Sequence, residues 1–175
     1  MVNYRRQHVS GGMYFFTVTL KNRQSGLLVD KAGLLGEVMR AVQAKKPWET
    51  LAIVIMPDHL HALWKMPAGD DDYSSRWRAI KSGFVRSLAK TGHVVDRNQR
   101  GEADIWQRRF WEHAIRDEDD LYRHIDYIHF NPVRHGQVSR VIDWPCSSFH
   151  RYVMQGVLPS DWAGTTEQFS GGFGE

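Results

Sequence analysis

The sequence predicts an α+β fold in which an antiparallel sheet carries its helices on one face. Short β-branched and aromatic runs alternate with longer runs of helical periodicity in the order β-α-β-β-α-β-α, which is typical of a ferredoxin-like core. The chain has 175 residues, of which 42% are apolar and 25% charged, enough for one domain with a buried core. We expect residues 1–164 to form this domain and the Gly-rich residues 165–175 to form a flexible C-terminal tail.

The predicted strands cover residues 13–20, 51–56, 59–66 and 104–115. The first is aromatic and β-branched, and it follows the Gly11-Gly12 pair, which suits the entry to a strand. Pro57 and Asp58 separate the second strand from the third. They favour a hairpin turn because proline presets φ and aspartate bonds the backbone around the corner.

The predicted helices cover residues 31–45, about 74–91, and 117–130. Apolar residues recur in the first two at three- and four-residue steps, and Ser74 and Ser75 are the expected caps of the second. The acidic first turn of the third helix suits the helix dipole. That helix is expected to stop before Asn131 and Pro132, because the residue before a proline disfavours helical geometry.

Composition limits the classes of function. The net charge of +3 is compatible with a nucleic-acid partner without requiring one. Cys146 is the only cysteine, which excludes an internal disulfide and a multi-cysteine zinc module. The longest apolar run, residues 51–56, is too short to span a bilayer, and no apolar block of signal-peptide length follows the basic N-terminus. We therefore expect a cytoplasmic protein without a membrane partner.

His59 and His61 occupy alternate positions at the start of a predicted strand. Strand side chains alternate between faces, so residues i and i+2 point the same way, roughly 6–7 Å apart. The two imidazoles can then converge on one cation while Leu60 points into the core, and Asp58 can orient one of the rings. Read alone, the spacing fits two surface histidines on an edge strand equally well.

Tyr127 and Asn131 are four residues apart, which places both on one helix face. The Asn131 amide would add an oxygen ligand to the two imidazoles. Mixed nitrogen and oxygen ligands with open positions suit Mn²⁺ or Mg²⁺ and do not exclude zinc. A core tyrosine and a helix-ending asparagine are the simpler alternative. Tyr122 points away from Tyr127 and has Asp126, not an amide, at i+4, so Tyr127 is the better candidate of the two tyrosines.

The two motifs together resemble the HUH single-tyrosine superfamily, and within it the REP-associated tyrosine transposases, which are relatives of insertion-sequence single-strand transposases. The resemblance covers most of the chain, including residues 3–6, 11–12, 56–61, 106–115, 126–133 and 143–149. Insertion-sequence relatives usually carry glutamine four residues after the tyrosine. This chain has Asn131 there, which fits the REP-associated branch.

This resemblance implies a role for each candidate residue. His59, His61 and Asn131 would hold Mg²⁺ or Mn²⁺, which would polarise the scissile phosphate. Tyr127 would attack that phosphate, forming a 5′-phosphotyrosine and freeing a 3′-OH. Covalent capture conserves the bond energy for rejoining, so no ATP is required. The implied substrate is single-stranded DNA with REP-type palindromic hairpins.

Basic and aromatic side chains supply candidates for DNA binding, because cations neutralise phosphates and aromatic rings stack on exposed bases. The candidates are Arg5, Arg6, Arg76, Trp77, Arg78 and Lys81. A solvated amphipathic helix with Trp77 in the core explains the same pattern. His113, which follows Glu112, is a further candidate for contact with the site.

Two other functions fit the same residues. One is a DNA-binding regulator that keeps the fold without catalysis, and the other is a metal-dependent phosphodiesterase without a covalent intermediate. Tyr127→Phe separates the second from a tyrosine transesterase, because only the tyrosine mechanism requires the phenol. The sequence leaves open whether the chain acts as a monomer or a homodimer, and whether Tyr127 acts in cis or in trans.

Overall fold

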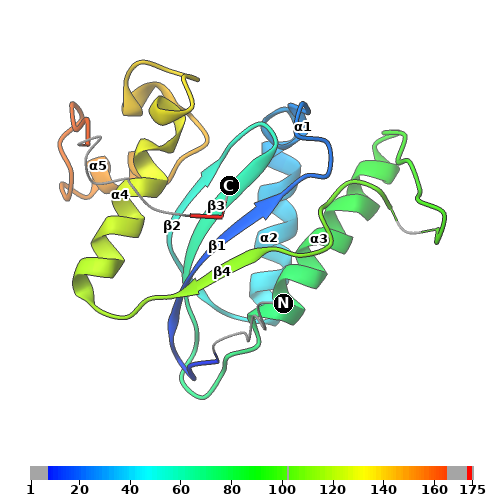
Figure 1. The fold of residues 1–175 in the computed structure, drawn as a ribbon, viewed down its shortest axis with the longest axis horizontal. Helices are drawn as coiled ribbons and strands as arrows, with labels where there is room; N and C mark the ends of the chain where they lie inside the picture. The colour runs from blue at the N-terminus through cyan, green and yellow to red at the C-terminus, as the bar shows by residue number, and fades with distance from the viewer. Residues whose placement is uncertain (1–7, 102, 165–172, 175) are drawn as a thin grey trace, which may run out of the picture.

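A four-stranded antiparallel sheet is the centre of the fold (Figure 1). The computed structural model describes residues 8–101, 103–164, 173 and 174. The strands are β1 (Met13–Thr19), β2 (Glu49–Ile55), β3 (His59–Lys65) and β4 (Trp111–Ala114), in the spatial order β2-β3-β1-β4. The predicted α+β class is confirmed, and the order is that of a ferredoxin-like sheet with β1 and β3 in the middle.

The predicted hairpin joins β2 to β3. The backbone N–H of Met56 donates to the carbonyl of His59 at 2.8 Å, which leaves Pro57 and Asp58 at the tip. The fourth strand is shorter than the predicted 104–115. Ahead of β4 the chain contacts the end of β1 only at intervals, where the N–H of Gln107 donates to the carbonyl of Thr19 and Leu20 forms an isolated bridge.

One face of the sheet is covered by α1 (Leu27–Asp30), α2 (Ala32–Lys45) and α3 (Tyr73–Lys90). The core on this side is aromatic. The Trp64 ring lies between Trp48 and Trp77, with centroid distances of 4.4 and 4.3 Å. Helix α3 begins slightly earlier than predicted, because the Asp72 side chain accepts the N–H of Ser75 at 3.0 Å.

The opposite face is covered by α4 (Glu118–Arg134), with η1 (Val141–Asp143) and α5 (Phe149–Met154) beside it (Figure 1). The expectation that the helices share one face is therefore wrong for α4. Phe15 and Phe16 are adjacent in β1, point to opposite faces and are both fully buried. A strand that is apolar on both faces requires a layer on each side.

Helix α4 also runs past its predicted end and contains Pro132. A proline there removes the helical bond to the Ile128 carbonyl, at a cost on the order of 3 kcal/mol in an exposed helix. Tertiary burial of the surrounding turn outweighs this local preference. The helix ends instead at Arg134, and Gly136 follows its C-cap with a φ of +65°, the left-handed conformation that favours glycine. In the described part of the chain, no helix is long and apolar enough to cross a membrane.

Candidate active site

His59 and His61 point from β3 toward α4. The neighbouring residues Leu60 and Ala62 face the α2–α3 core, so strand alternation directs the two histidines to the other side. Their ring centroids are 4.9 Å apart with planes inclined by 74°, and both residues are buried.

A neighbouring side chain bonds the Nδ1 atom of each imidazole. Asp58 Oδ1 lies 2.8 Å from Nδ1 of His59, and the Thr17 hydroxyl lies 2.9 Å from Nδ1 of His61. Arg23 pairs with the other Asp58 oxygen at 2.5 Å. Partial burial would raise the pKa of Asp58, but the bonds to His59 and Arg23 outweigh it and hold the pKa below its ordinary value. The carboxylate therefore stays charged where it bonds the His59 ring.

Tyr127 and Asn131 lie on the buried face of α4, and neither is exposed to solvent. The Tyr127 ring centroid is 5.2 Å from that of His61, so α4 and β3 bring the tyrosine and a histidine together. Arg134, two turns further along the helix, donates from Nη1 to the Tyr127 hydroxyl at 2.7 Å. Tyr122 is 56% exposed and bonds Glu118 on the outer face.

Phe173 also lies at the site, a residue for which sequence reasoning had no signal. Its ring stacks on Tyr127 with centroids 3.7 Å apart, and its carbonyl accepts the Thr17 hydroxyl at 2.6 Å. Thr17 thus links Phe173 to His61. The rest of the predicted flexible tail, apart from Gly174, lies outside the described residues, as do the DNA-binding candidates Arg5 and Arg6.

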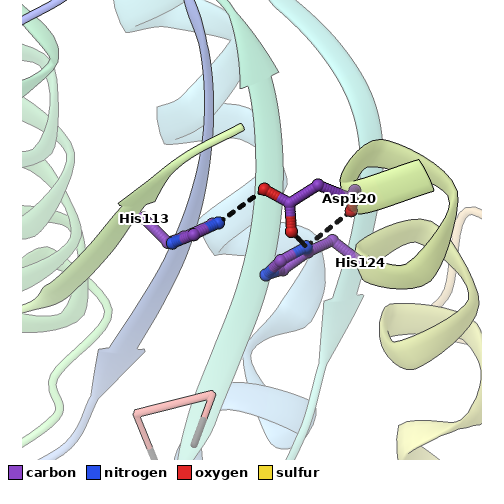
Figure 2. A group of neighbouring side chains, drawn as sticks. All are labelled: His113, Asp120 and His124. Atoms are coloured by element: carbon purple, nitrogen blue, oxygen red, sulfur yellow. Dashed lines mark hydrogen bonds and ion pairs between the residues drawn. The ribbon is translucent and has the colours of Figure 1, made fainter. Parts of the chain in front are cut away.

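His113 forms a second polar cluster with Asp120 and His124 (Figure 2). Asp120 Oδ2 lies 2.8 Å from Nε2 of His113, and the Asp120 carbonyl lies 2.7 Å from Nδ1 of His124. Burial would raise the pKa of Asp120, but bonds from Arg116 and His113 hold it far below its ordinary value. Burial lowers the pKa of His124, which keeps that ring neutral.

This cluster joins β4 to the first turns of α4. Its ligand-type atoms lie within 4.8 Å of one another, but the His113 and His124 rings stack with planes only 15° apart. Imidazole lone pairs lie in the ring plane, so stacked rings do not direct both lone pairs at one ion. We interpret the cluster as an ion-pair network that anchors α4. The cluster brings His113 to Asp120, a residue that the sequence pattern marked only as part of an acidic first turn.

The α3 candidates for DNA binding divide into buried and surface residues. The Arg76 guanidinium is buried, where it pairs with Asp70 at 2.7 Å and donates to the Pro47 carbonyl at 2.8 Å. Trp77 is 1% exposed and stacked on Trp64. The expectation that Arg76 and Trp77 contact DNA is therefore wrong. Both side chains are buried in the α3 layer, where they stabilise the fold.

Arg78 and Lys81 instead line a cleft between α3 and the segment that leads to β4. The cleft combines cations with aromatic rings on its walls. The basic residues are Lys21, Arg78, Lys81, Arg86, Arg97, Arg100 and Arg108, and the aromatic ones are Trp77, Trp106 and Phe110. The Lys81 ammonium lies 5.6 Å from the Phe110 centroid. Such a surface matches the phosphates and bases of nucleic acid.

The side chains of His59, His61 and Asn131 are of types that bind divalent metals. With Nδ1 of each imidazole engaged, Nε2 is the atom that would coordinate, and the Asp58–His59 bond is the carboxylate–histidine arrangement common behind metal ligands. Two imidazole nitrogens and an amide oxygen suit Mn²⁺ better than Mg²⁺, because Mg²⁺ prefers ligands that are all oxygen.

Comparisons with known proteins agree with this architecture. Residues 8–131 match the family described as "Transposase IS200 like". A REP-associated tyrosine transposase of Escherichia coli K12 is 46% identical over 172 residues, which cover 98% of this chain and 97% of the relative. A Haemophilus influenzae protein assigned provisionally to the same group is 45% identical, over 95% of this chain and 96% of its own.

A solved structure of a REP-associated tyrosine transposase bound to a REP hairpin superimposes with a TM-score of 0.85. It is 46% identical in sequence and covers 97% of this chain and 96% of its own. The chain therefore belongs to the IS200-like transposase family, and within that family to the REP-associated tyrosine transposases. Transposases are enzymes that cut and join DNA strands.

Proposed function

We propose that the protein is a metal-dependent transesterase that cuts and rejoins single-stranded DNA at REP-type hairpins through a 5′-phosphotyrosine. The observation that carries this proposal is the contact of Tyr127 with His61 across α4 and β3, with ring centroids 5.2 Å apart. A nucleophile beside a candidate metal ligand is the arrangement that in-line attack on a polarised phosphate needs.

Each residue has one role in this mechanism. His59, His61 and Asn131 hold a divalent metal, which supplies charge stabilisation at the phosphate when bound. Asp58 and Thr17 fix the two imidazole rings through their Nδ1 atoms. The Tyr127 oxygen forms a bond to phosphorus and the 3′-oxygen leaves. The reverse attack by a 3′-OH rejoins the strand and releases the tyrosine.

The basic and aromatic cleft beside α3 is the proposed DNA-binding surface. Arg78 and Arg108 would contact backbone phosphates, while Trp106 and Phe110 offer rings for unpaired bases. The hairpin in the structure of the 46% identical relative supports hairpin DNA as the ligand class. Arg78 and Arg108 are exposed, whereas Arg76 is buried.

Cleavage of a labelled REP-type hairpin with single-stranded flanks tests the proposal. Wild type and Tyr127→Phe are incubated with Mn²⁺ or Mg²⁺ and resolved on denaturing gels that retain protein joined to DNA. We expect a covalent adduct that disappears in Tyr127→Phe and with chelator. Binding without an adduct favours the regulator function, and cleavage that survives Tyr127→Phe favours a hydrolytic phosphodiesterase.

A further inference from the structure

Arg134 lies between the candidate nucleophile and solvent. It is in the last turn of α4, seven residues after Tyr127, on the same face of the helix. Its Nη1 donates to the Tyr127 hydroxyl at 2.7 Å, and its Cζ is 5.2 Å from the ring centroid. Arg134 is exposed whereas Tyr127 is fully buried, so the guanidinium covers the solvent side of the phenol oxygen.

A guanidinium can bind two oxygens at once because its donors form a planar fork. One donor already contacts the phenol oxygen. Once that oxygen approaches phosphorus, the non-bridging phosphate oxygens come within reach of the other donors of the same group. The carbonyls at the C-terminal end of α4 carry negative partial charge that repels a phosphate, and the Arg134 charge offsets that repulsion.

We propose that Arg134 is a further catalytic residue, whose guanidinium bridges the Tyr127 oxygen and a non-bridging oxygen of the scissile phosphate. This inference rests on the proposed function. In the step, an electron pair of the phenol oxygen forms the O–P bond and the P–O3′ bond breaks. The phenol proton passes to water, and the 3′-oxygen takes a proton from water. Arg134 stays protonated throughout and stabilises the charge on the phosphate oxygens.

Three variants test this role: Arg134→Gln, Arg134→Lys and, as a control, Arg140→Gln. Arg140 is a 66% exposed arginine whose partner is Asp143 at 4.0 Å, outside the site. Single-turnover cleavage and the Kd for the hairpin are measured separately, and thermal unfolding checks that each variant is folded. We expect Arg134→Gln to lower the rate about 100- to 1000-fold, the effect of losing one oxyanion donor. Its Kd should stay within about threefold of wild type.

Arg134→Lys should recover part of the rate, because a lysine keeps the charge but not the fork. Arg140→Gln should cleave like wild type. Sulfur in place of one non-bridging oxygen tests the contact directly. One phosphorothioate diastereomer should lower the cleavage rate of wild type but should not lower the rate of Arg134→Gln any further. An arginine with a purely structural role does not produce this coupling.

The role is overturned if Arg134→Gln cleaves within about threefold of wild type, if rate and binding fall together, or if both diastereomers slow wild type and variant equally. The proposed function fails in a different way. In that case wild type forms no adduct, or Tyr127→Phe still cleaves, and the assignment of Arg134 falls with it.

Discussion

The rings of Phe173 and Tyr127 are stacked 3.7 Å apart, with planes inclined by only 13°. The Phe173 carbonyl also accepts the Thr17 hydroxyl, which in turn bonds His61. A residue near the C-terminus therefore covers the candidate nucleophile and is tied to a candidate metal ligand. We expect this contact to open when a phosphodiester reaches the Tyr127 oxygen.

Phe173→Ala should therefore increase cleavage. Loss of an aromatic pair worth about 0.5–1.5 kcal/mol shifts the opening equilibrium roughly two- to tenfold. The measurement is the single-turnover rate on the labelled hairpin. Phe173→Tyr keeps the ring and serves as the control, with a rate close to wild type. A lower rate in Phe173→Ala would mean that the ring supports the tyrosine and does not block it.

Asp58→Asn should weaken metal binding through His59. The amide removes the charge that orients the imidazole. Mutation of a residue that bonds a metal-ligating histidine typically lowers metal affinity about 10- to 100-fold. Titration calorimetry with Mn²⁺ measures the Kd without reference to cleavage. His93→Gln, in the segment after α3, is a matched control. Equal affinity for Mn²⁺ in Asp58→Asn and wild type would argue against a metal on this histidine pair.

Arg108→Gln should weaken hairpin binding and reduce its salt dependence. Each phosphate contact that is lost lowers the slope of log K against log salt by about 0.7 to 0.9. Anisotropy titrations from low to moderate salt give that slope. Arg140→Gln again serves as the control, because it removes the same charge outside the cleft. An unchanged slope in Arg108→Gln places the DNA elsewhere.

Asp120→Asn should destabilise the fold. Its carboxylate is buried and accepts hydrogen bonds from Arg116 and His113. An amide cannot accept all of these bonds, and a poorly bonded buried polar group costs about 1–3 kcal/mol. Thermal unfolding should show a lower Tm than in Asp119→Asn, a control from the same helical turn. Added Zn²⁺ should change the Tm of wild type and Asp120→Asn by the same amount, whereas a rise that is lost in Asp120→Asn would reveal a metal site at this cluster.

Local sequence patterns predicted the elements well because periodicity is a local property. The alternation in β3 gave the shared face of His59 and His61, and the four-residue helical step gave that of Tyr127 and Asn131. The same logic missed the second helical layer. Adjacent apolar residues such as Phe15 and Phe16 indicate a strand buried on both faces, but the pattern does not say which helix covers the second face.

Other features depend on contacts between distant residues. Pro132 disfavours a helix locally, yet packing against the sheet carries α4 through it. Asp120 belongs to an acidic first turn that suits the helix dipole, and only the fold turns it inward to His113. Phe173 lies in a Gly-rich segment with no periodicity, so its stacking on Tyr127 has no sequence signal.

Burial should make His129 a source of acid sensitivity. His129 is fully buried on α4, with Nε2 3.0 Å from the Ser148 hydroxyl, and burial lowers its pKa to about 3. In the unfolded chain the pKa is about 6.5. The folded state thus keeps the ring neutral, and its contribution to stability is fully present above pH 6.5. As pH falls toward 3, the unfolded chain binds a proton that the folded protein does not, so stability is lost.

His129→Gln removes this titration while keeping a group that can bond Ser148. At pH 4 the wild-type loss from this one residue is on the order of 3 kcal/mol relative to pH 7. Urea unfolding at both pH values gives the loss for each protein. Other groups with lowered pKa values also lose stability as the pH falls, namely Asp58, Asp120 and His124. The effect of His129 is therefore the difference between the losses of wild type and His129→Gln. His150→Gln should retain the full pH dependence, and an equal loss in His129→Gln would show that His129 is protonated in the folded state.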